Sequence, residues 1–270
     1  MAPAGRTPLR YLRHPAFGDA PPALPAPQVS EFSFARDAYL LDIDGTLLDI
    51  APTPDSVRVP ATLKASLTIL QQSADGALAL VSGRPLSAID RLFTPLSLAA
   101  IGCHGAEWRK KAGGHTEVRA ARLSQNLRSA LLAAVSDLPE IRIEDKGYTL
   151  AFHYRGAPTR KTVLEQRLAT LIEPLQSEFC LLHGKAVFEV KSCAFDKGEA
   201  IAALMNVPPF AGRRPVFAGD DHTDEYALTV VGGLGGVGIS VGRRLPGANR
   251  MLPAPYALRS WLGHLARAAA

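Results

Sequence analysis

The chain has 270 residues, of which 47% are apolar and 20% charged, and its formal net charge is +5. These values fit one large or two small globular domains and exclude a polyelectrolyte. Lysine and arginine are scattered rather than massed, which does not indicate nucleic-acid binding; it fits either the handling of a small anion or ordinary surface charge.

The three cysteines, Cys103, Cys180 and Cys193, are widely spaced and odd in number. This pattern predicts neither a disulfide framework nor a zinc site and favours a cytoplasmic location. We interpret Cys103 and Cys193 as small apolar fillers. No segment reaches the apolar length of a membrane span, and the N-terminus lacks the apolar stretch of a secretory signal.

The predicted elements follow a leader. Residues 1–33 are rich in proline and alanine, and we expect them to be disordered. Strands and helices then alternate: strands are predicted at 38–43, 77–81 and 98–103, and helices at 60–72 and 85–93. This alternation is typical of a parallel sheet with helices on its faces.

The middle of the chain has a different pattern. Helices at 123–135 and 162–173 are mixed with strands at 141–144, 149–154, 179–182 and 187–191, which indicates an α+β insert. The earlier rhythm then resumes with helices at 198–205, 223–230 and 258–267 and strands at 215–218 and 237–241. We predict an α/β fold: a Rossmann-like parallel-sheet hydrolase core over 34–113 and 192–270, with an inserted α+β cap domain over 114–191.

Polar clusters lie at the carboxyl ends of the predicted core strands or at the start of the next helix. They are Asp42-x-Asp44, Ser82-Gly83-Arg84, Lys197-Gly198 and Gly219-Asp220-Asp221-His222-Thr223-Asp224-Glu225. Alternation along the strand places Asp42 and Asp44 on one side. The carboxyl ends of parallel strands converge on one edge of the sheet, so these groups are expected to meet. Carboxylates bind Mg²⁺, whereas hydroxyl, ammonium and helix N-terminal groups bind phosphate oxygens, so the set predicts metal-assisted phosphoryl transfer.

These clusters resemble the four motifs of the haloacid-dehalogenase superfamily of phosphatases. More narrowly, the chain is similar to trehalose-6-phosphate phosphatases from about Tyr39 to Leu262. The segments that carry this resemblance are Val81-Ser82-Gly83-Arg84, Gly102-Cys103-His104-Gly105-Ala106-Glu107, Glu144-Asp145-Lys146, His153-Tyr154-Arg155, Gly184-Lys185, Glu189-Val190-Lys191 and the run from Gly219 to Glu225.

The resemblance implies a role for each catalytic residue. Asp42 is expected to accept the phosphoryl group, and Asp44 to protonate the departing sugar oxygen and then activate water. Ser82 and Lys197 are expected to bind the phosphoryl oxygens. Lys197 is also expected to keep the Asp42 carboxylate ionised.

The resemblance also implies a cofactor and a sugar site. Mg²⁺ is expected at the Asp42 carboxylate, the Asp44 backbone carbonyl and Asp220, with Asp221 close by. The expected sugar-binding residues are Glu144, Lys146, Lys185 and Glu189 of the insert, with Arg84, His104 and Glu107 at the rim. A mobile cap, hinged near Gly113-Gly114 and near Ser192, is expected to cover the site.

Plainer interpretations stay open for individual residues. Asp42 and Asp44 can be read as solvated turn acids, Ser82 as a helix cap, and the residues of the insert as solvated strand faces. Asp224 and Glu225 can be acids favoured by a helix dipole or residues near the metal. One departure from the family pattern is clear: the run from Lys191 to Lys197 lacks the proline and glycine that often precede the motif lysine, which leaves Lys191 without an assigned role.

We therefore predict a Mg²⁺-dependent phosphatase that releases trehalose from trehalose 6-phosphate through an aspartyl-phosphate. One alternative is a related enzyme acting on sucrose phosphate or glucosylglycerol phosphate, or a sugar phosphomutase. Another is a non-catalytic trehalose-6-phosphate sensor or the phosphatase subunit of a synthase complex. We expect a cytoplasmic monomer whose partner is a small sugar phosphate, and an association with trehalose-6-phosphate synthase is a further candidate.

Overall fold

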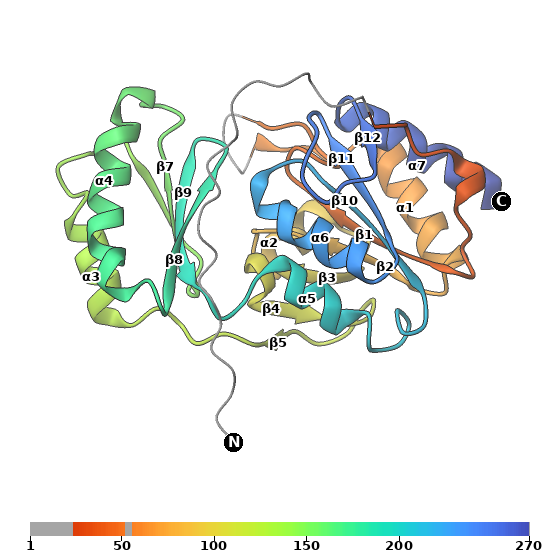
Figure 1. Cartoon of the computed structure of the whole chain (residues 1–270), viewed down its shortest axis with the longest axis horizontal. Helices are drawn as coiled ribbons and strands as arrows, with labels where there is room; N and C mark the ends of the chain where they lie inside the picture. The colour runs from red at the N-terminus through yellow and green to blue at the C-terminus, as the bar shows by residue number, and fades with distance from the viewer. Residues whose placement is uncertain (1–23, 52–55, 270) are drawn as a thin grey trace.

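The computed structural model describes residues 24–51 and 56–269, and it contains two β-sheets that lie side by side (Figure 1). The helices are α1 (Ala61–Ser73), α2 (Leu86–Phe93), α3 (Gln125–Ala133), α4 (Lys161–Ile172), α5 (Lys197–Leu204), α6 (Glu225–Gly233) and α7 (Pro255–Ala269). No helix in these two ranges is long and apolar enough to cross a membrane.

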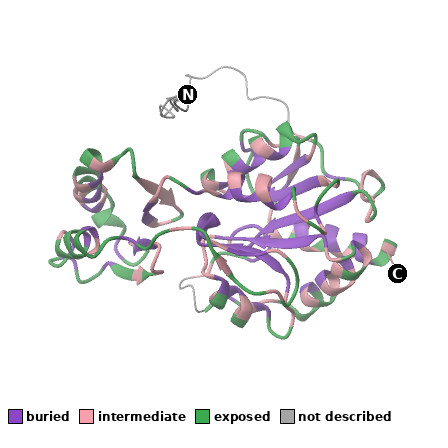
Figure 2. Ribbon diagram, turned by 90° about the horizontal axis from the view of Figure 1, so that it is seen from below, coloured by how far each residue is buried: buried purple, intermediate pink, exposed green. Residues whose placement is uncertain are grey.

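The larger sheet has eight strands in the order β12-β11-β10-β1-β2-β3-β4-β5. Its strands are β1 (Asp37–Asp42), β2 (Leu78–Val81), β3 (Ala99–Gly102), β4 (Glu107–Arg109), β5 (Glu117–Val118), β10 (Arg214–Gly219), β11 (Val237–Val241) and β12 (Arg250–Leu252). The six strands from β12 to β3 run parallel, and β4 and β5 continue the sheet antiparallel. Helices lie on both sides of the buried strands (Figure 2).

The central strands of this sheet are apolar because both faces are covered. Every residue of β1 and β2 is buried, which explains their continuous apolar runs. Helix α1 packs on α7, and α5 packs on α6. Strand β1 thus lies fully buried inside the sheet, between β10 and β2, with Asp42 as its last residue.

The smaller sheet is antiparallel, with the order β6-β7-β9-β8. Its strands are β6 (Arg142–Asp145), β7 (Thr149–His153), β8 (Phe179–Gly184) and β9 (Val187–Ser192). Phe152 and Phe188 pair across β7 and β9 and form a separate core with leucines of α3 and α4. Because side chains alternate, Glu144 and Glu189 occupy the opposite face, away from these helices. This face carries the polar groups that contact the larger domain.

The predicted fold class is confirmed, and the expected helices and strands are present with shifted ends. Three short strands, β4, β5 and β12, were not predicted. Since β5 belongs to the larger sheet, the core continues to Val118 rather than ending at residue 113, and β9 keeps Ser192 in the cap.

The leader was expected to be disordered through residue 33, and this is wrong for its last part. Phe32 packs edge-on against Trp261 of α7, with ring centroids 4.9 Å apart. Glu31 pairs with Arg250 of β12 at 2.7 Å. An aromatic contact and an ion pair thus fix this segment to the core. Residues 1–23 lie outside the described part of the chain.

Candidate active site

Three adjacent strands bring the expected acids and hydroxyl together. In the order β10-β1-β2, Asp42 ends β1, Ser82 follows β2 and Asp220 follows β10. The register pairs Asp42 with Val81, so Ser82 begins level with the end of β1. The convergence predicted from the sequence is therefore present in the fold.

Lys197, the first residue of α5, lies between two buried carboxylates. Its Nζ donates to Asp42 Oδ1 at 2.8 Å and to Asp224 Oδ1 at 2.7 Å. Burial alone would lower the pKa of Lys197, but the charges of Asp224 and Asp42 outweigh it and raise the pKa well above its ordinary value. Lys197 therefore places an ammonium group at the end of β1.

Asp42, Asp220 and Asp224 form a cluster of three buried carboxylates. One oxygen from each lies within 4.8 Å of the others. Burial, helped by the neighbouring acids Asp224 and Asp220, raises the pKa of Asp42 despite the opposing charge of Lys197. Burial likewise raises the pKa of Asp220. Carboxylates gathered in this way repel one another unless a further cation is present.

The donor set and the space around it fit Mg²⁺. All the ligand atoms are carboxylate oxygens, which suit a hard divalent ion. Gly45 has φ +91°, and a Cβ at this position would lie 2.2 Å from Asp220 Oδ2. Only glycine therefore keeps the cradle next to Asp220 open.

Within this cluster, Asp224 takes a place that the sequence analysis gave to Asp221. Asp224 Oδ2 accepts hydrogen bonds from the backbone N–H groups of Asp220 and Asp221, at 3.0 and 3.2 Å. Asp221 Oδ1 instead accepts from the N–H and hydroxyl of Thr223, at 2.8 and 2.6 Å. Asp221 thus shapes the loop, and Asp224 fixes both the loop and Lys197.

Asp44 points to a different partner from Asp42. The guanidinium of Arg84 donates from Nε and Nη2 to the two oxygens of Asp44, each at 2.7 Å. The turn after Asp44 is closed by a hydrogen bond from Gly45 N–H to Leu48 C=O at 2.7 Å. Thr46 in this turn donates its hydroxyl to Asp220 Oδ1 at 3.0 Å. Arg84 was expected among the sugar contacts, and no role was expected for Thr46.

Ser82 is buried and lies against an unusual turn. Its hydroxyl accepts from Arg84 N–H at 3.1 Å, and its carbonyl accepts from His104 N–H at 3.0 Å. Cys103 and His104 both have positive φ, 47° and 55°, a strained conformation for residues with a Cβ. Residue 83 is glycine because a Cβ there would lie 2.4 Å from His104 Nε2.

The cap reaches this turn through a network of buried charges. Lys146 donates to Gly83 C=O at 2.9 Å and to Glu189 Oε2 at 3.0 Å, and His104 Nε2 lies 3.3 Å from the same Glu189 oxygen. Burial alone would raise the pKa of Glu189, but Lys146 and His104 hold it well below its ordinary value. Burial lowers the pKa of His104. These three predicted sugar residues thus join cap and core.

The other predicted sugar residues have separate partners. Glu144 pairs with His153 at 2.9 Å on the core-facing side of the cap sheet. Lys185, in the turn between β8 and β9, contacts the Asp220 carboxylate directly. Glu107 accepts the N–H of Leu86 at 2.7 Å at the start of α2 and so supports that helix. Glu144 and Lys185 belong to the cap, and of the two Lys185 contacts the acid cluster.

Comparison with known proteins agrees with this geometry. A family model described as trehalose-phosphatase matches residues 40–255. The chain belongs to this family. A probable trehalose-phosphate phosphatase from Sinorhizobium fredii is 42% identical over 85% of the chain and 87% of that protein, and the trehalose-6-phosphate phosphatase of Escherichia coli is 38% identical over 88% and 89%. The resemblance seen in the sequence is confirmed.

A solved structure confirms the fold. The C-terminal domain of the C. albicans trehalose-6-phosphate phosphatase superposes with a TM-score of 0.78 at 20% identity, covering 92% of this chain and 99% of that one. This likeness shows that the two chains share their overall fold.

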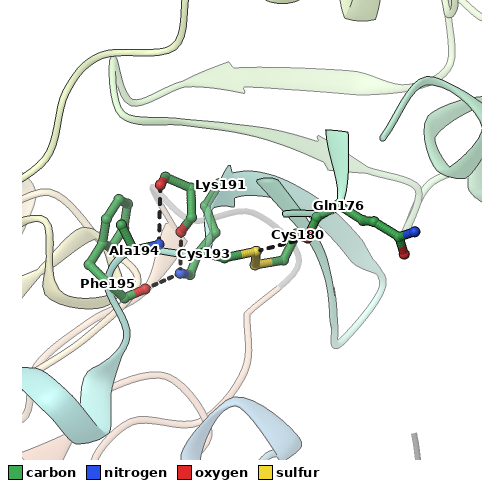
Figure 3. Close-up of a disulfide and its surroundings, with 7 residues drawn as sticks. Gln176, Cys180, Lys191, Cys193, Ala194 and Phe195 are labelled. Atoms are coloured by element: carbon green, nitrogen blue, oxygen red, sulfur yellow. Dashed lines mark hydrogen bonds between the residues drawn. A yellow bond between two sulfur atoms is a disulfide. The ribbon is translucent and has the colours of Figure 1, made fainter. Parts of the chain in front are cut away.

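The connection from β9 to α5 departs from the sequence analysis. Cys180 of β8 and Cys193 form a disulfide, whereas the cysteine spacing predicted no disulfide framework, and the interpretation of Cys193 as an apolar filler is wrong (Figure 3). Their pairing follows from the sheet, because Cys180 lies opposite Lys191 on β9, two residues before Cys193. Cys103 is buried and free, as expected.

Proposed function

We propose that this chain hydrolyses trehalose 6-phosphate to trehalose and phosphate. The observation that carries the proposal is the position of Asp42. Its side chain is buried at the end of β1, accepts a hydrogen bond from the Lys197 ammonium and lies beside Asp220. A phosphate monoester at this point meets a nucleophile, a cation and a set of acids suited to Mg²⁺. Family membership supports the phosphatase chemistry, and the names of the two curated relatives support the substrate.

In the first half-reaction, an oxygen of Asp42 forms a bond to phosphorus while the bond from phosphorus to the sugar oxygen breaks. Lys197 and Ser82 hold the phosphoryl oxygens. Asp44 enters this step with a proton on one carboxyl oxygen and gives it to the departing sugar oxygen, while Arg84 keeps the other oxygen in place. In the second half, Asp44 takes a proton from water, the water oxygen bonds to phosphorus, and Asp42 leaves as a carboxylate.

Mg²⁺ would be held by Asp42, Asp220 and the backbone carbonyl of Asp44, with Asp221 and Asp224 shaping the loop around it. When bound, the ion neutralises charge that develops on the phosphoryl oxygens.

The cap supplies the residues that distinguish one sugar from another. Glu144 and Glu189 lie on the same face of its sheet, and Lys185 comes from the adjoining turn. Carboxylates and ammonium groups bind sugar hydroxyls by charge-assisted hydrogen bonds. We assign sugar recognition to this face, with Lys146 and His104 at its border with the core.

A phosphate-release screen over sugar phosphates, with and without EDTA, tests the proposal. We expect the highest kcat/KM on trehalose 6-phosphate and loss of activity in EDTA that is restored by Mg²⁺. Comparable rates on sucrose 6-phosphate would contradict the assigned substrate. Asp42→Asn should bind trehalose 6-phosphate without turning it over; if the wild type also binds it without turnover, the chain is a sensor rather than an enzyme.

We also propose that the chain is a cytoplasmic monomer. The Cys180–Cys193 disulfide removes one argument for that location. Size-exclusion chromatography with light scattering tests the monomer, and co-elution with trehalose-6-phosphate synthase tests the association.

A further inference from the structure

Lys191, near the end of β9, is a buried lysine without a role in the proposed reaction. Its Nζ donates to the carbonyl oxygen of Ser192 at 2.7 Å and to that of Phe195, and it lies 4.3 Å from the centre of the Phe195 ring (Figure 3). The residue is only 3% exposed. Its ammonium therefore binds the backbone of the chain segment that leads from the cap to α5.

A charge is seldom buried to bind carbonyl groups, since removing it from water is unfavourable. Burial lowers the pKa of Lys191 to about 8, so the charged form still predominates at neutral pH. The segment from Ser192 to Asp196 contains neither proline nor glycine. The Lys191 side chain restrains this segment, because it draws the carbonyl groups of Ser192 and Phe195 into one turn.

The segment is held on its cap side as well. Cys193 is joined to Cys180 by the disulfide, and its N–H donates to Glu178 C=O at 2.8 Å. Residues up to Cys193 therefore belong to the cap sheet, and the bend into the core falls between Ala194 and Asp196. Lys191 spans this bend through its contact with Phe195.

The bend leads directly to the phosphate-binding lysine. Asp196 caps α5 by accepting the N–H of Glu199 at 2.8 Å, and Lys197 is the first residue of that helix. The bend is also closely packed: a Cβ on Gly105 would lie 2.7 Å from the carbonyl oxygen of Asp196. A shift at Phe195 therefore moves the start of α5, and with it the Lys197 ammonium that lies 2.8 Å from Asp42.

We propose that Lys191 is a positioning residue that sets Lys197 against Asp42 by fixing the turn between β9 and α5. This inference rests on the phosphoryl-transfer function proposed above. It predicts that loss of the ammonium impairs the transition state more than sugar binding, because the sugar-facing residues of the cap sheet are unchanged.

The test compares Lys191→Met, which removes the charge but keeps an apolar stem, with Lys191→Arg, which keeps a cationic donor. We expect Lys191→Met to lower kcat by roughly 10- to 100-fold, with a much smaller change in KM, as displacement of a catalytic group by about 1 Å does. Lys191→Arg should restore a large part of kcat. Lys64→Met is the matched control, because Lys64 of α1 also donates to a backbone carbonyl, that of Thr94, outside the site; its kcat should equal that of the wild type.

A second measurement does not depend on turnover. Orthovanadate, a phosphate analogue, should bind Lys191→Met more weakly than the wild type in Mg²⁺, as measured by isothermal titration calorimetry. If the wild type turns over no sugar phosphate, the proposed function fails, whereas the vanadate comparison still decides the role of Lys191.

The inference is overturned if Lys191→Met keeps wild-type kcat and vanadate affinity and only its unfolding temperature falls, because Lys191 would then be merely structural. If Lys191→Met does not fold, Lys191→Gln replaces it, and equal kcat in the Gln and Arg variants would equally overturn the inference.

Discussion

Arg84 binds both carboxylate oxygens of Asp44, each at 2.7 Å. The planar guanidinium matches a carboxylate in this two-point geometry, and lysine does not. The contact joins the loop after β2 to the residue proposed to move the proton. Arg84 therefore orients Asp44, whereas the sequence predicted a sugar contact.

Arg84→Lys tests this orientation. The variant keeps the charge but loses one of two charge-assisted hydrogen bonds, so kcat should fall by about tenfold while KM changes little. Steady-state kinetics with trehalose 6-phosphate as the substrate gives both values. Arg91→Lys, on the exposed side of α2, is the control and should match the wild type. A raised KM with unchanged kcat would instead place Arg84 on the sugar.

Mg²⁺ should stabilise the fold as well as support turnover. The carboxylates of Asp42, Asp220 and Asp224 repel one another, and an ion bound only in the folded state relieves this, adding about 2.7 kcal/mol when its concentration is 100 times its Kd. Thermal unfolding should therefore shift upward with Mg²⁺ and return on chelation. Asp220→Asn should abolish the shift, and Asp75→Asn, at a carboxylate exposed by 82%, should keep it. An unchanged shift in Asp220→Asn would contradict the assigned metal site.

Glu189→Gln should make the contact between cap and core less dependent on pH. Because the folded-state pKa of Glu189 lies below its ordinary value of 4.5, its ion pair stabilises the fold fully above that pH and is lost as pH falls toward the folded pKa. In Glu189→Gln the buried ammonium of Lys146 loses its negatively charged partner. This should lower the free energy of unfolding by about 3 kcal/mol at pH 7.

Urea unfolding of both proteins at pH 7 and below pH 4 measures this effect. The difference in free energy of unfolding should shrink at the lower pH. A difference that is equal at both pH values would mean that the ionised form of Glu189 is not the stabilising one.

Reduction of the disulfide should weaken the cap. Cys180 and Cys193 are 13 residues apart, and closing a loop of this size stabilises a fold by about 3 kcal/mol through the entropy of the unfolded chain. Dithiothreitol should lower the urea concentration at which half of the wild-type protein is unfolded. The Cys193→Ser variant should have this lower midpoint without reductant, and dithiothreitol should not change it. Thiol labelling before reduction should find one cysteine per denatured chain; three would contradict the bond.

The core could be predicted from the sequence because short segments of the chain determine its strands and the polar residues at their ends. Asp42, Ser82 and Asp220 each lie at the end of an apolar strand or directly after it, and parallel strands place such ends on one edge of the sheet. Lys197 was found by its place at the start of a helix. The strands β4 and β12 were missed because they are short and carry charged residues such as Glu107 and Arg250, so neither shows an apolar run.

The side-chain partners could not be predicted, because they depend on register and on the docking of two domains. Asp221 and Asp224 are both acids of one loop, and only its bend decides that Asp224 meets Lys197. The disulfide depends on which residue of β9 lies opposite Cys180. From the sequence alone, Glu189 and Lys146 can be interpreted as solvated residues. Their burial follows from the contact between cap and core, in which Lys146 donates to Gly83 C=O.

The packed end of the leader has one further consequence, for solubility. Strand β12 is the last strand of the eight-stranded sheet, and such an outer strand invites pairing with another molecule. Here the N–H of Met251 donates to Pro25 C=O at 3.1 Å, and Arg250 is engaged by Glu31. The segment from Pro25 to Glu31 thus shields the outer strand, and a chain shortened to begin at Phe34 would expose it to self-association and aggregation.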